Sequence, residues 1–292
     1  MKKIIVIFLV CSTTTMLSAA ERRKRSKEVS IKPILVVYKT IGEVELKLHI
    51  FEPPERQVKE PLPAVVFFFG GGWVGGTPTQ FYHQCDYFAS RGMVAISAEY
   101  RVKNRHGTTP FECVADGKSA IRWVRANAAR LGVNPNKIAA GGGSAGGHVA
   151  ACTGVIEGLD EESEDRKISS KPNALVLFNP AVDLIELSKK RRSDERFNRV
   201  KEISPLQHVK KDVPPCIIFH GTADRTVSFG SVERFSKAMK EAGNVCQLVP
   251  FEGKGHGFFN YGRDKDNSSF KQTIRAADRF LTSLGYLKDV SK

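Results

Sequence analysis

Cysteine is scarce in this sequence, and its spacing excludes a fold stapled by disulfides. Six cysteines occur among 292 residues, and Cys11 lies in an N-terminal segment that we expect to be removed. The others are odd in number and form no C-x-x-C motif, so a disulfide framework is excluded and a single disulfide remains open. The sequence also lacks H-E-x-x-H and any clustered Cys/His pattern, so we predict a protein without a metal or a cofactor.

Apolar runs long enough to span a bilayer are absent as well. The run at residues 4–10 follows Lys2 and Lys3 and is too short to cross a membrane. A tail of polar and small residues then ends at Ala20, where cleavage is expected. We interpret residues 1–20 as a secretory signal peptide, with an uncleaved anchor as the alternative. We therefore expect a secreted or periplasmic protein without stable membrane insertion after cleavage.

No motif of nucleic-acid recognition accompanies the positive charge. The net charge is +14, and much of it lies in two runs, at residues 21–27 and 189–201. Neither run has interleaved aromatic side chains or belongs to a known nucleic-acid module. We predict a flexible basic leader over residues 21–30, a solvated basic surface elsewhere and no nucleic-acid partner. The sequence leaves the oligomeric state open.

The remaining chain alternates between short apolar runs and helical patterns. Residues 34–40 and 43–51 flank a turn, and alternating polarity in the second run predicts a hairpin with one solvated face. Later runs are almost wholly apolar, as in parallel strands covered on both faces: AVVFFF, MVAISA, KIAAGG, ALVLFNP, CIIFHG and CQLVPF. Apolar stripes at helical spacing separate several of them, at 114–131, 229–242 and 270–284. We predict one α/β domain over residues 31–288, with a mostly parallel central sheet, an N-terminal antiparallel hairpin and helices on both faces.

The stretch KIAAGGGSAGGHVAAC, residues 137–152, fits two motifs that carry different chemistry. Gly141, Gly143 and Gly146 match the G-x-G-x-x-G of dinucleotide-binding turns. Ser144 lies equally in G-x-S-x-G, the turn that presents a nucleophilic serine. The dinucleotide motif belongs in the first βα turn and needs an acidic residue that ends the next strand. Neither condition holds here, so we favour the nucleophile.

Three further features support a serine nucleophile. The apolar run KIAAGG precedes Ser144, and a helical pattern follows it. Asp224 and His256 each follow an apolar strand, in the chain order serine, acid, histidine that such hydrolases use. The glycine-rich strand end VFFFGGGWVGG can present consecutive backbone N–H groups to an oxyanion. Asp183 also follows an apolar strand and is the rival acid.

These motifs resemble the α/β-hydrolase superfamily, specifically its carboxylesterase and acetylxylan-esterase-like (BD-FAE-like) branch. The similarity covers nearly all of the mature chain and is densest in AEYR, DGKSAIRWVRANAARLGVNPNKIAAGGGSAGGH, FHGTAD and GKGHGF. It implies the α/β-hydrolase fold and the catalytic residues Ser144, Asp224 and His256. It also implies an oxyanion hole formed by the backbone amides of Gly71, Gly72 and Ala145. The H-G-G-G-W motif of this branch begins with Phe69 here, so we expect apolar packing to hold that loop.

Several neighbouring residues have less specific assignments. Trp73 beside the oxyanion glycines and His106 in NRHGTTP are candidates for the substrate pocket. His148, one turn after Ser144, is interpreted as part of the helix rather than as a ligand. The basic segment 184–205 is either a partial lid over the pocket or a plain surface insertion.

The resemblance and the signal peptide together imply a function. We expect an exported serine esterase that hydrolyses carboxylic esters through an acyl-enzyme, with short acyl groups on a carbohydrate or another small molecule. A general carboxylesterase for small esters is the alternative. A peptidase would need an additional screening domain, for which this chain has no room. A catalytically silent binding protein of the same fold would commonly lack the serine, the histidine or the oxyanion glycines, and all are present here.

Overall fold

The computed structural model describes residues 29–54, 60–189 and 199–289. The predicted signal peptide, most of the predicted basic leader and the middle of segment 184–205 lie outside the described residues. The contacts group the residues from Ile31 onward into one compact unit. Within the described ranges, no helix combines the length and the apolar character that a membrane crossing requires.

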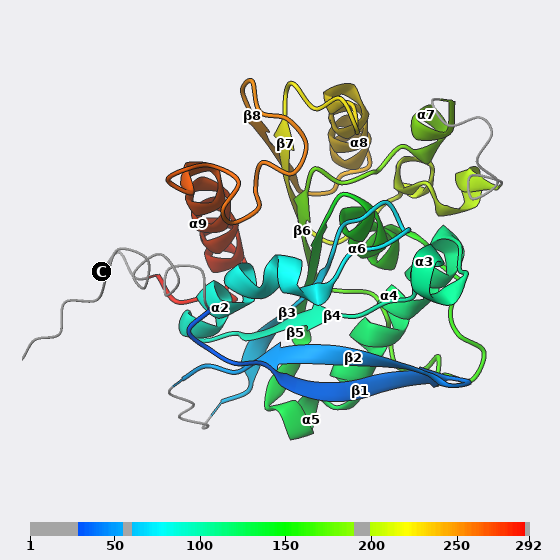
Figure 1. Ribbon diagram of the computed structural model, residues 1–292, viewed down its shortest axis with the longest axis vertical. Helices are drawn as coiled ribbons and strands as arrows, with labels where there is room; N and C mark the ends of the chain where they lie inside the picture. The colour runs from blue at the N-terminus through cyan, green and yellow to red at the C-terminus, as the bar shows by residue number, and fades with distance from the viewer. Residues whose placement is uncertain (1–28, 55–59, 190–198, 290–292) are drawn as a thin grey trace, which may run out of the picture. The chain divides into compact units, whose positions relative to one another are not determined.

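One mixed sheet organises the unit Ile31–Lys292, and its strands run in the order β1-β2-β4-β3-β5-β6-β7-β8 (Figure 1). The strands β1 and β2 are antiparallel to each other, β2 is antiparallel to β4, and the remaining neighbours are parallel. This arrangement confirms the predicted parallel sheet with an N-terminal hairpin. The strands are β1 (Ile34–Ile41), β2 (Val44–Phe51), β3 (Leu62–Phe68), β4 (Val94–Ala98), β5 (Val133–Gly143), β6 (Ala174–Phe178), β7 (Cys216–Gly221) and β8 (Cys246–Phe251).

Helices cover both faces of this sheet, as predicted. In Figure 1, α2 and α9 lie on one face, whereas α4, α6 and α8 lie on the other. The longer helices are α2 (Tyr82–Ser90), α4 (Pro110–Ala126), α6 (Ala145–Val155), α8 (Phe229–Glu241) and α9 (Ser268–Ser283). Shorter helical segments are η1 (Pro78–Phe81), α3 (Lys103–His106), α5 (Ala128–Leu131), α7 (Leu184–Lys189), η3 (Val200–Ile203) and η4 (Pro205–His208).

The N-terminus of α4 follows directly from its local sequence. Thr109 accepts a hydrogen bond from Phe111 N–H, and Glu112 accepts one from the Thr109 backbone N–H, which together form a capping box. Pro110 begins the helix, where its missing N–H costs nothing. The predicted stripe at 114–131 is divided between α4 and α5, because the helix is interrupted at Asn127.

Two details of strand burial differ from the prediction. The face of β2 that we predicted to be solvated is partly covered. His49 on this face is only 9% exposed, because its ring lies against Tyr82 of α2 with Nδ1 2.5 Å from the tyrosine oxygen. The strand β8 is not buried on both faces, since Gln247 and Pro250 are exposed. It lies at the edge of the sheet, where a proline without an N–H is tolerated.

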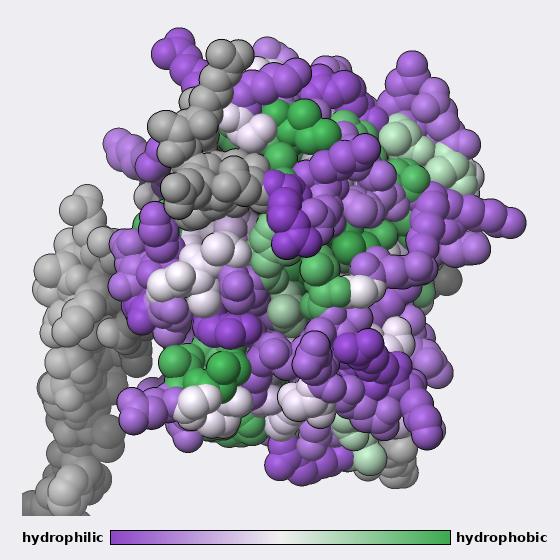
Figure 2. All heavy atoms as spheres, turned by 90° about the vertical axis from the view of Figure 1, so that its right-hand side faces the viewer, coloured by the Kyte–Doolittle hydropathy of each residue, from purple (hydrophilic) through white to green (hydrophobic). Residues whose placement is uncertain are grey.

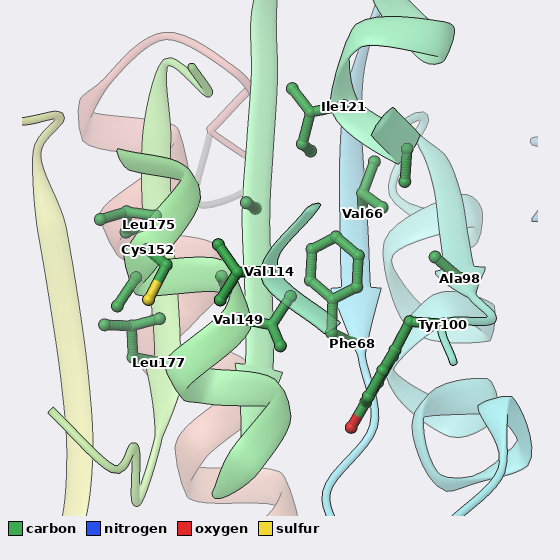
Figure 3. Close-up of a cluster of buried hydrophobic side chains, with 14 of the residues drawn as sticks. Val66, Phe68, Ala98, Tyr100, Val114, Ile121, Val149, Cys152, Leu175 and Leu177 are labelled. Carbon is green, nitrogen blue, oxygen red and sulfur yellow. The ribbon is translucent and has the colours of Figure 1, made fainter. Parts of the chain in front are cut away.

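The core between the sheet and the helices α4 and α6 requires very close helix packing. Figure 3 shows Val114 of α4 and Val149 of α6 beside the ring of Phe68 from β3, all within one buried cluster. Gly117 permits this contact, since a Cβ there would lie 2.4 Å from a methyl group of Val149. The helices α4 and α6 therefore pack closely over β3, the strand that leads to the oxyanion glycines.

The opposite face of the sheet is packed with aromatic rings. Phe67 stacks on Phe81 at 4.9 Å between ring centroids, and Phe178 contacts Phe259 at 4.8 Å. Phe81 and Phe259 also stack on each other at 5.7 Å. Because Phe259 follows β8 and Phe81 follows β3, this layer connects the two halves of the sheet beneath the site.

One face of the molecule is largely hydrophilic, and the described cysteines are buried. On the face shown in Figure 2, hydrophilic side chains predominate and hydrophobic ones gather in the middle. The described cysteines, Cys85, Cys113, Cys152, Cys216 and Cys246, are buried and free, so no disulfide joins any two of them. Burial raises the pKa of the Cys85 and Cys152 thiols well above the usual value, which keeps them protonated.

Candidate active site

Ser144 lies on a strained turn between β5 and α6. Its φ of 54° and ψ of −117° are unusual for a residue with a side chain, and its N–H donates to Phe178 O at 3.0 Å. Close packing enforces the turn: a Cβ on Gly146 would lie 2.0 Å from Phe68 O, and one on Gly142 would lie 2.4 Å from Gly146 O. The G-x-S-x-G prediction therefore describes the local geometry correctly.

The structure brings the three predicted catalytic side chains into one hydrogen-bonded row. His256 Nε2 lies 2.9 Å from Ser144 Oγ, and His256 Nδ1 lies 2.7 Å from Asp224 Oδ2. The three residues follow β5, β7 and β8, whose carboxyl ends meet at the same edge of the sheet. The arrangement matches the geometry of serine hydrolases, in which a hydroxyl, an imidazole and a carboxylate stand in line.

The environment of Asp224 fixes the direction of these hydrogen bonds. Its Oδ1 accepts from the backbone N–H groups of Thr226 and Val227, at 2.8 and 3.0 Å. Burial favours the neutral carboxyl group, but the hydrogen bonds from His256 and Val227 outweigh it and lower the pKa of Asp224 below its usual value. Because the ionised carboxylate only accepts, His256 Nδ1 carries the proton and Nε2 is left to accept from the hydroxyl of Ser144.

The rival acid, Asp183, has different partners. Its Oδ1 accepts from Glu186 N–H at the start of α7, and its Oδ2 accepts from Arg234 of α8 at 2.8 Å. The side chain is therefore engaged with α7 and α8, whereas the carboxylate at the imidazole of His256 is that of Asp224.

The predicted oxyanion donors lie next to Ser144. Gly71 and Gly72 line the same pocket as the serine, and Ala145 is the first residue of α6. Gly71 has a φ of 132°, and a Cβ there would lie 2.2 Å from Gly75 O, so the loop requires glycine at this position. The first N–H groups of a helix have no acceptor within it, which makes the Ala145 amide suited to an anion.

A pocket of about 290 Å³ opens at Ser144. It is lined by Gly70, Gly71, Gly72, Trp73, Gln80, Ser144, Asn179, Ala181, Leu187, Thr226, Val227, His256, Gly257, Phe259 and Asn260. Trp73 belongs to this lining, as predicted. His106, the other candidate, is not part of this lining: its Nδ1 accepts from Val102 N–H at 2.9 Å within its own loop.

Trp73 is held in place by His148, which lies one turn into α6. Trp73 Nε1 donates to His148 Nδ1 at 3.1 Å, and His148 Nε2 donates to Ile203 O at 2.6 Å. The imidazole is completely buried, and burial lowers the pKa of His148 from 6.5 to about 4. A neutral ring is needed here, because Nδ1 has to accept from the indole.

Several residues of the pocket were not predicted from the sequence. Gln80, Asn179 and Asn260 contribute carboxamides, and Leu187 contributes an apolar wall from α7. Asn260 follows His256 closely in GHGFFN, which is a weak local signal, but Gln80 and Asn179 belong to no motif. Leu187 also brings segment 184–205 to the pocket, although residues 190–198 lie outside the described residues, so its role as a lid stays a prediction.

Comparison with known families agrees with this geometry. The BD-FAE family profile matches residues 48–239, and the profile of the dienelactone hydrolase family matches residues 193–287. The chain belongs to the α/β-hydrolase carboxylesterase family. The predicted resemblance to this family is therefore confirmed.

Several esterases are among the solved structures and curated proteins similar to this chain. The apo form of Thermogutta terrifontis esterase 2 is 50% identical with a TM-score of 0.84, covering 90% of this chain and 98% of that one. The same esterase has been solved phosphoramylated by tabun. Esterase LipC of Mycobacterium tuberculosis is 29% identical over 68% of this chain and 54% of its own length. The chain spans about half the length of the curated relatives that it matches.

The assignment of the acid predicts a sharp contrast between two substitutions. Asp224→Asn should lower kcat on the order of 10⁴-fold, because an amide in that position stabilises the wrong histidine tautomer. Asp183→Asn removes an equal charge from a carboxylate bound to Arg234 and should leave kcat close to the wild-type value. Steady-state hydrolysis of a nitrophenyl ester measures both. Loss of activity in Asp183→Asn alone would contradict the assignment of Asp224.

Burial of neutral His148 predicts a dependence of stability on pH. Between about pH 6.5 and pH 4 the unfolded chain binds a proton at this residue that the folded chain does not, so stability falls as the pH falls. The loss over the whole window amounts to about 3 kcal/mol for a group with this shift. Urea unfolding at pH 7 and pH 4.5 should show a smaller difference in His148→Gln than in wild type. Equal differences in the two proteins would refute the idea.

Proposed function

We propose that this chain is an exported serine esterase that removes short acyl groups from carboxylic esters. The observation that carries the proposal is the row Ser144–His256–Asp224, with 2.9 and 2.7 Å between its members, at a pocket lined by Gly71 and Gly72. Ser144 Oγ attacks the ester carbonyl while His256 Nε2 takes its proton. The imidazolium then protonates the leaving alcohol, and water repeats the cycle on the acyl-enzyme.

The size of the pocket supports a short acyl group. At about 290 Å³ it lies at the lower end of the range of ligand pockets, and Trp73, Leu187 and Phe259 are among its apolar walls. Structures of the similar Thermogutta terrifontis esterase have been solved with propionate and with butyrate bound. Both are short carboxylates, and we propose acyl groups of similar length for this chain.

For the alcohol part we propose a carbohydrate, in the manner of acetylxylan esterases. The support for this step is the family resemblance together with the predicted signal peptide, because polysaccharide substrates lie outside the cell. A general esterase for small esters remains the alternative, and it shares the acyl chemistry but not the preference for acetylated sugar.

A chain-length series tests the proposed reaction. The purified chain should hydrolyse nitrophenyl acetate, propionate and butyrate, with kcat/KM falling steeply toward the octanoate, because the longer chain exceeds the pocket. It should also release acetate from acetylated xylan, and Ser144→Ala should abolish both activities. Release from nitrophenyl esters without release from xylan selects the general esterase. A folded wild type that neither hydrolyses any ester nor reacts with a fluorophosphonate would select a silent binding protein.

Export is proposed from the N-terminal sequence. Residues 4–10 form an apolar run after Lys2 and Lys3, and cleavage is expected after Ala20. Expressed in a Gram-negative host, the periplasmic protein should begin at Glu21 on N-terminal sequencing. Introducing charge into the run, with Val6→Lys and Phe8→Lys, should retain the full-length chain in the cytoplasm. A periplasmic product that keeps its first 20 residues would instead indicate an uncleaved anchor.

A further inference from the structure

Two loops supply the backbone amides and the imidazole of the site, and they leave the sheet at separate strands. The oxyanion loop (residues 70–73) follows β3, and the histidine loop (residues 255–260) follows β8. In the sheet, β5, β6 and β7 lie between those two strands. Hydrogen bonds of the sheet therefore do not connect the loops directly, and their separation across Ser144 depends on other contacts.

Two carboxamide side chains bridge the loops in a continuous row of hydrogen bonds. Gly70 N–H of the oxyanion loop donates to Gln80 Oε1 at 2.5 Å. Gln80 Nε2 then donates to Asn260 Oδ1 at 2.9 Å, and Asn260 Nδ2 donates to Gly257 O at 2.8 Å. Each carboxamide uses its oxygen for one bond and its nitrogen for the next. Neither can turn over without breaking two hydrogen bonds.

Both ends of this row are fixed in turn. The peptide group between Phe69 and Gly70 is held at its carbonyl as well, because Tyr100 donates its hydroxyl to Phe69 O at 2.6 Å. At the other end, Gly257 N–H donates to Asn179 Oδ1 at 3.0 Å. Asn179 is fully buried, so this anchor does not move with the surface. The row therefore runs from a peptide group held by Tyr100 to a peptide group held by the buried Asn179.

The aromatic layer supports the same connection from below. Phe81 follows Gln80, and Phe259 precedes Asn260, and the two rings stack at 5.7 Å with 26° between their planes. Gly143, next to Ser144, lies against the same ring, since a Cβ there would be 2.4 Å from Phe259. The hydrogen-bonded row above and the stacked rings beneath thus hold the same two loops.

We infer that Gln80 and Asn260 are positioning residues that fix the separation of the oxyanion loop and the histidine loop across Ser144. This inference rests on the esterase function proposed above. The oxyanion donors and the imidazole must act on one tetrahedral intermediate, and a misplacement of about 1 Å costs about 100-fold in rate. The pair also supplies polar bracing in a loop whose motif begins with Phe69 instead of histidine.

A double-mutant cycle tests the inference on nitrophenyl butyrate. Gln80→Met and Asn260→Leu each break the row and should lower kcat about 10- to 100-fold while changing KM little, because alignment matters most in the transition state. The double variant should lose no more kcat than the more impaired of the two single variants, because one break already separates the loops. Losses that multiply, losses confined to KM, or unchanged kcat in either single variant would overturn the inference.

Matched controls separate positioning from stability and from the proposed function. Gln84→Met removes a buried carboxamide of α2 whose nitrogen and oxygen have no hydrogen-bond partner among the described residues, and it should leave kcat unchanged. Thermal unfolding identifies any variant that does not fold. In that case Gln80→Glu replaces Gln80→Met: it keeps the acceptor for Gly70 N–H but cannot donate to Asn260 Oδ1, so it should lower kcat about as much as Asn260→Leu. A wild type that neither hydrolyses esters nor reacts with a fluorophosphonate would refute the proposed function itself. An active wild type whose Gln80 and Asn260 variants keep their full kcat would refute only the positioning role.

Discussion

The site depends on how closely the N-terminus of α6 approaches the end of β3. Gly146 has no side chain, and the carbonyl of Phe68 occupies the space where a Cβ would be, 2.0 Å away. This contact places the first turn of α6 beside the strand end that continues into the oxyanion glycines. It also forces Ser144 into a backbone conformation that costs about 1–3 kcal/mol. Burial of α6 on all sides, between the sheet and α4, offsets that strain.

Convergence of the remaining groups follows from the parallel sheet. The strands β3, β5, β7 and β8 run in the same direction, so their following loops all emerge at one edge. Ser144 is central, with the oxyanion loop on one side and the loops of Asp224 and His256 on the other. The sheet fixes the order of these groups but not their separation at the scale of a hydrogen bond. That finer distance is set by side chains that connect the loops, such as the carboxamides of Gln80 in η1 and Asn260 in the histidine loop.

The sequence predicts those parts of the molecule that repeat a pattern. Apolar runs mark every parallel strand, and the motif around Ser144, with the later Asp224 and His256, indicates the row that the structure contains. The position of a strand within the sheet cannot be predicted from such a local pattern. The run CQLVPF predicts a strand buried on both faces, but β8 lies at the edge of the sheet. The alternating pattern of the second strand predicts a solvated His49, but Tyr82 covers its ring. Both errors arise because neighbours distant in the chain determine exposure.

The choice of the acid shows the same limit at the level of the site. Asp183 and Asp224 each follow an apolar strand, so this local pattern does not distinguish the two residues. After β6 the chain enters α7, so Asp183 accepts from the helix amide of Glu186 and pairs with Arg234. After β7 the chain turns, and the backbone amides of two following residues hold the carboxylate of Asp224. Its other oxygen contacts His256, which lies in the loop after the neighbouring strand β8. The adjacency of β7 and β8 places the Asp224 carboxylate 2.7 Å from the imidazole of His256, whereas the carboxylate of Asp183 is already bound by α7 and α8.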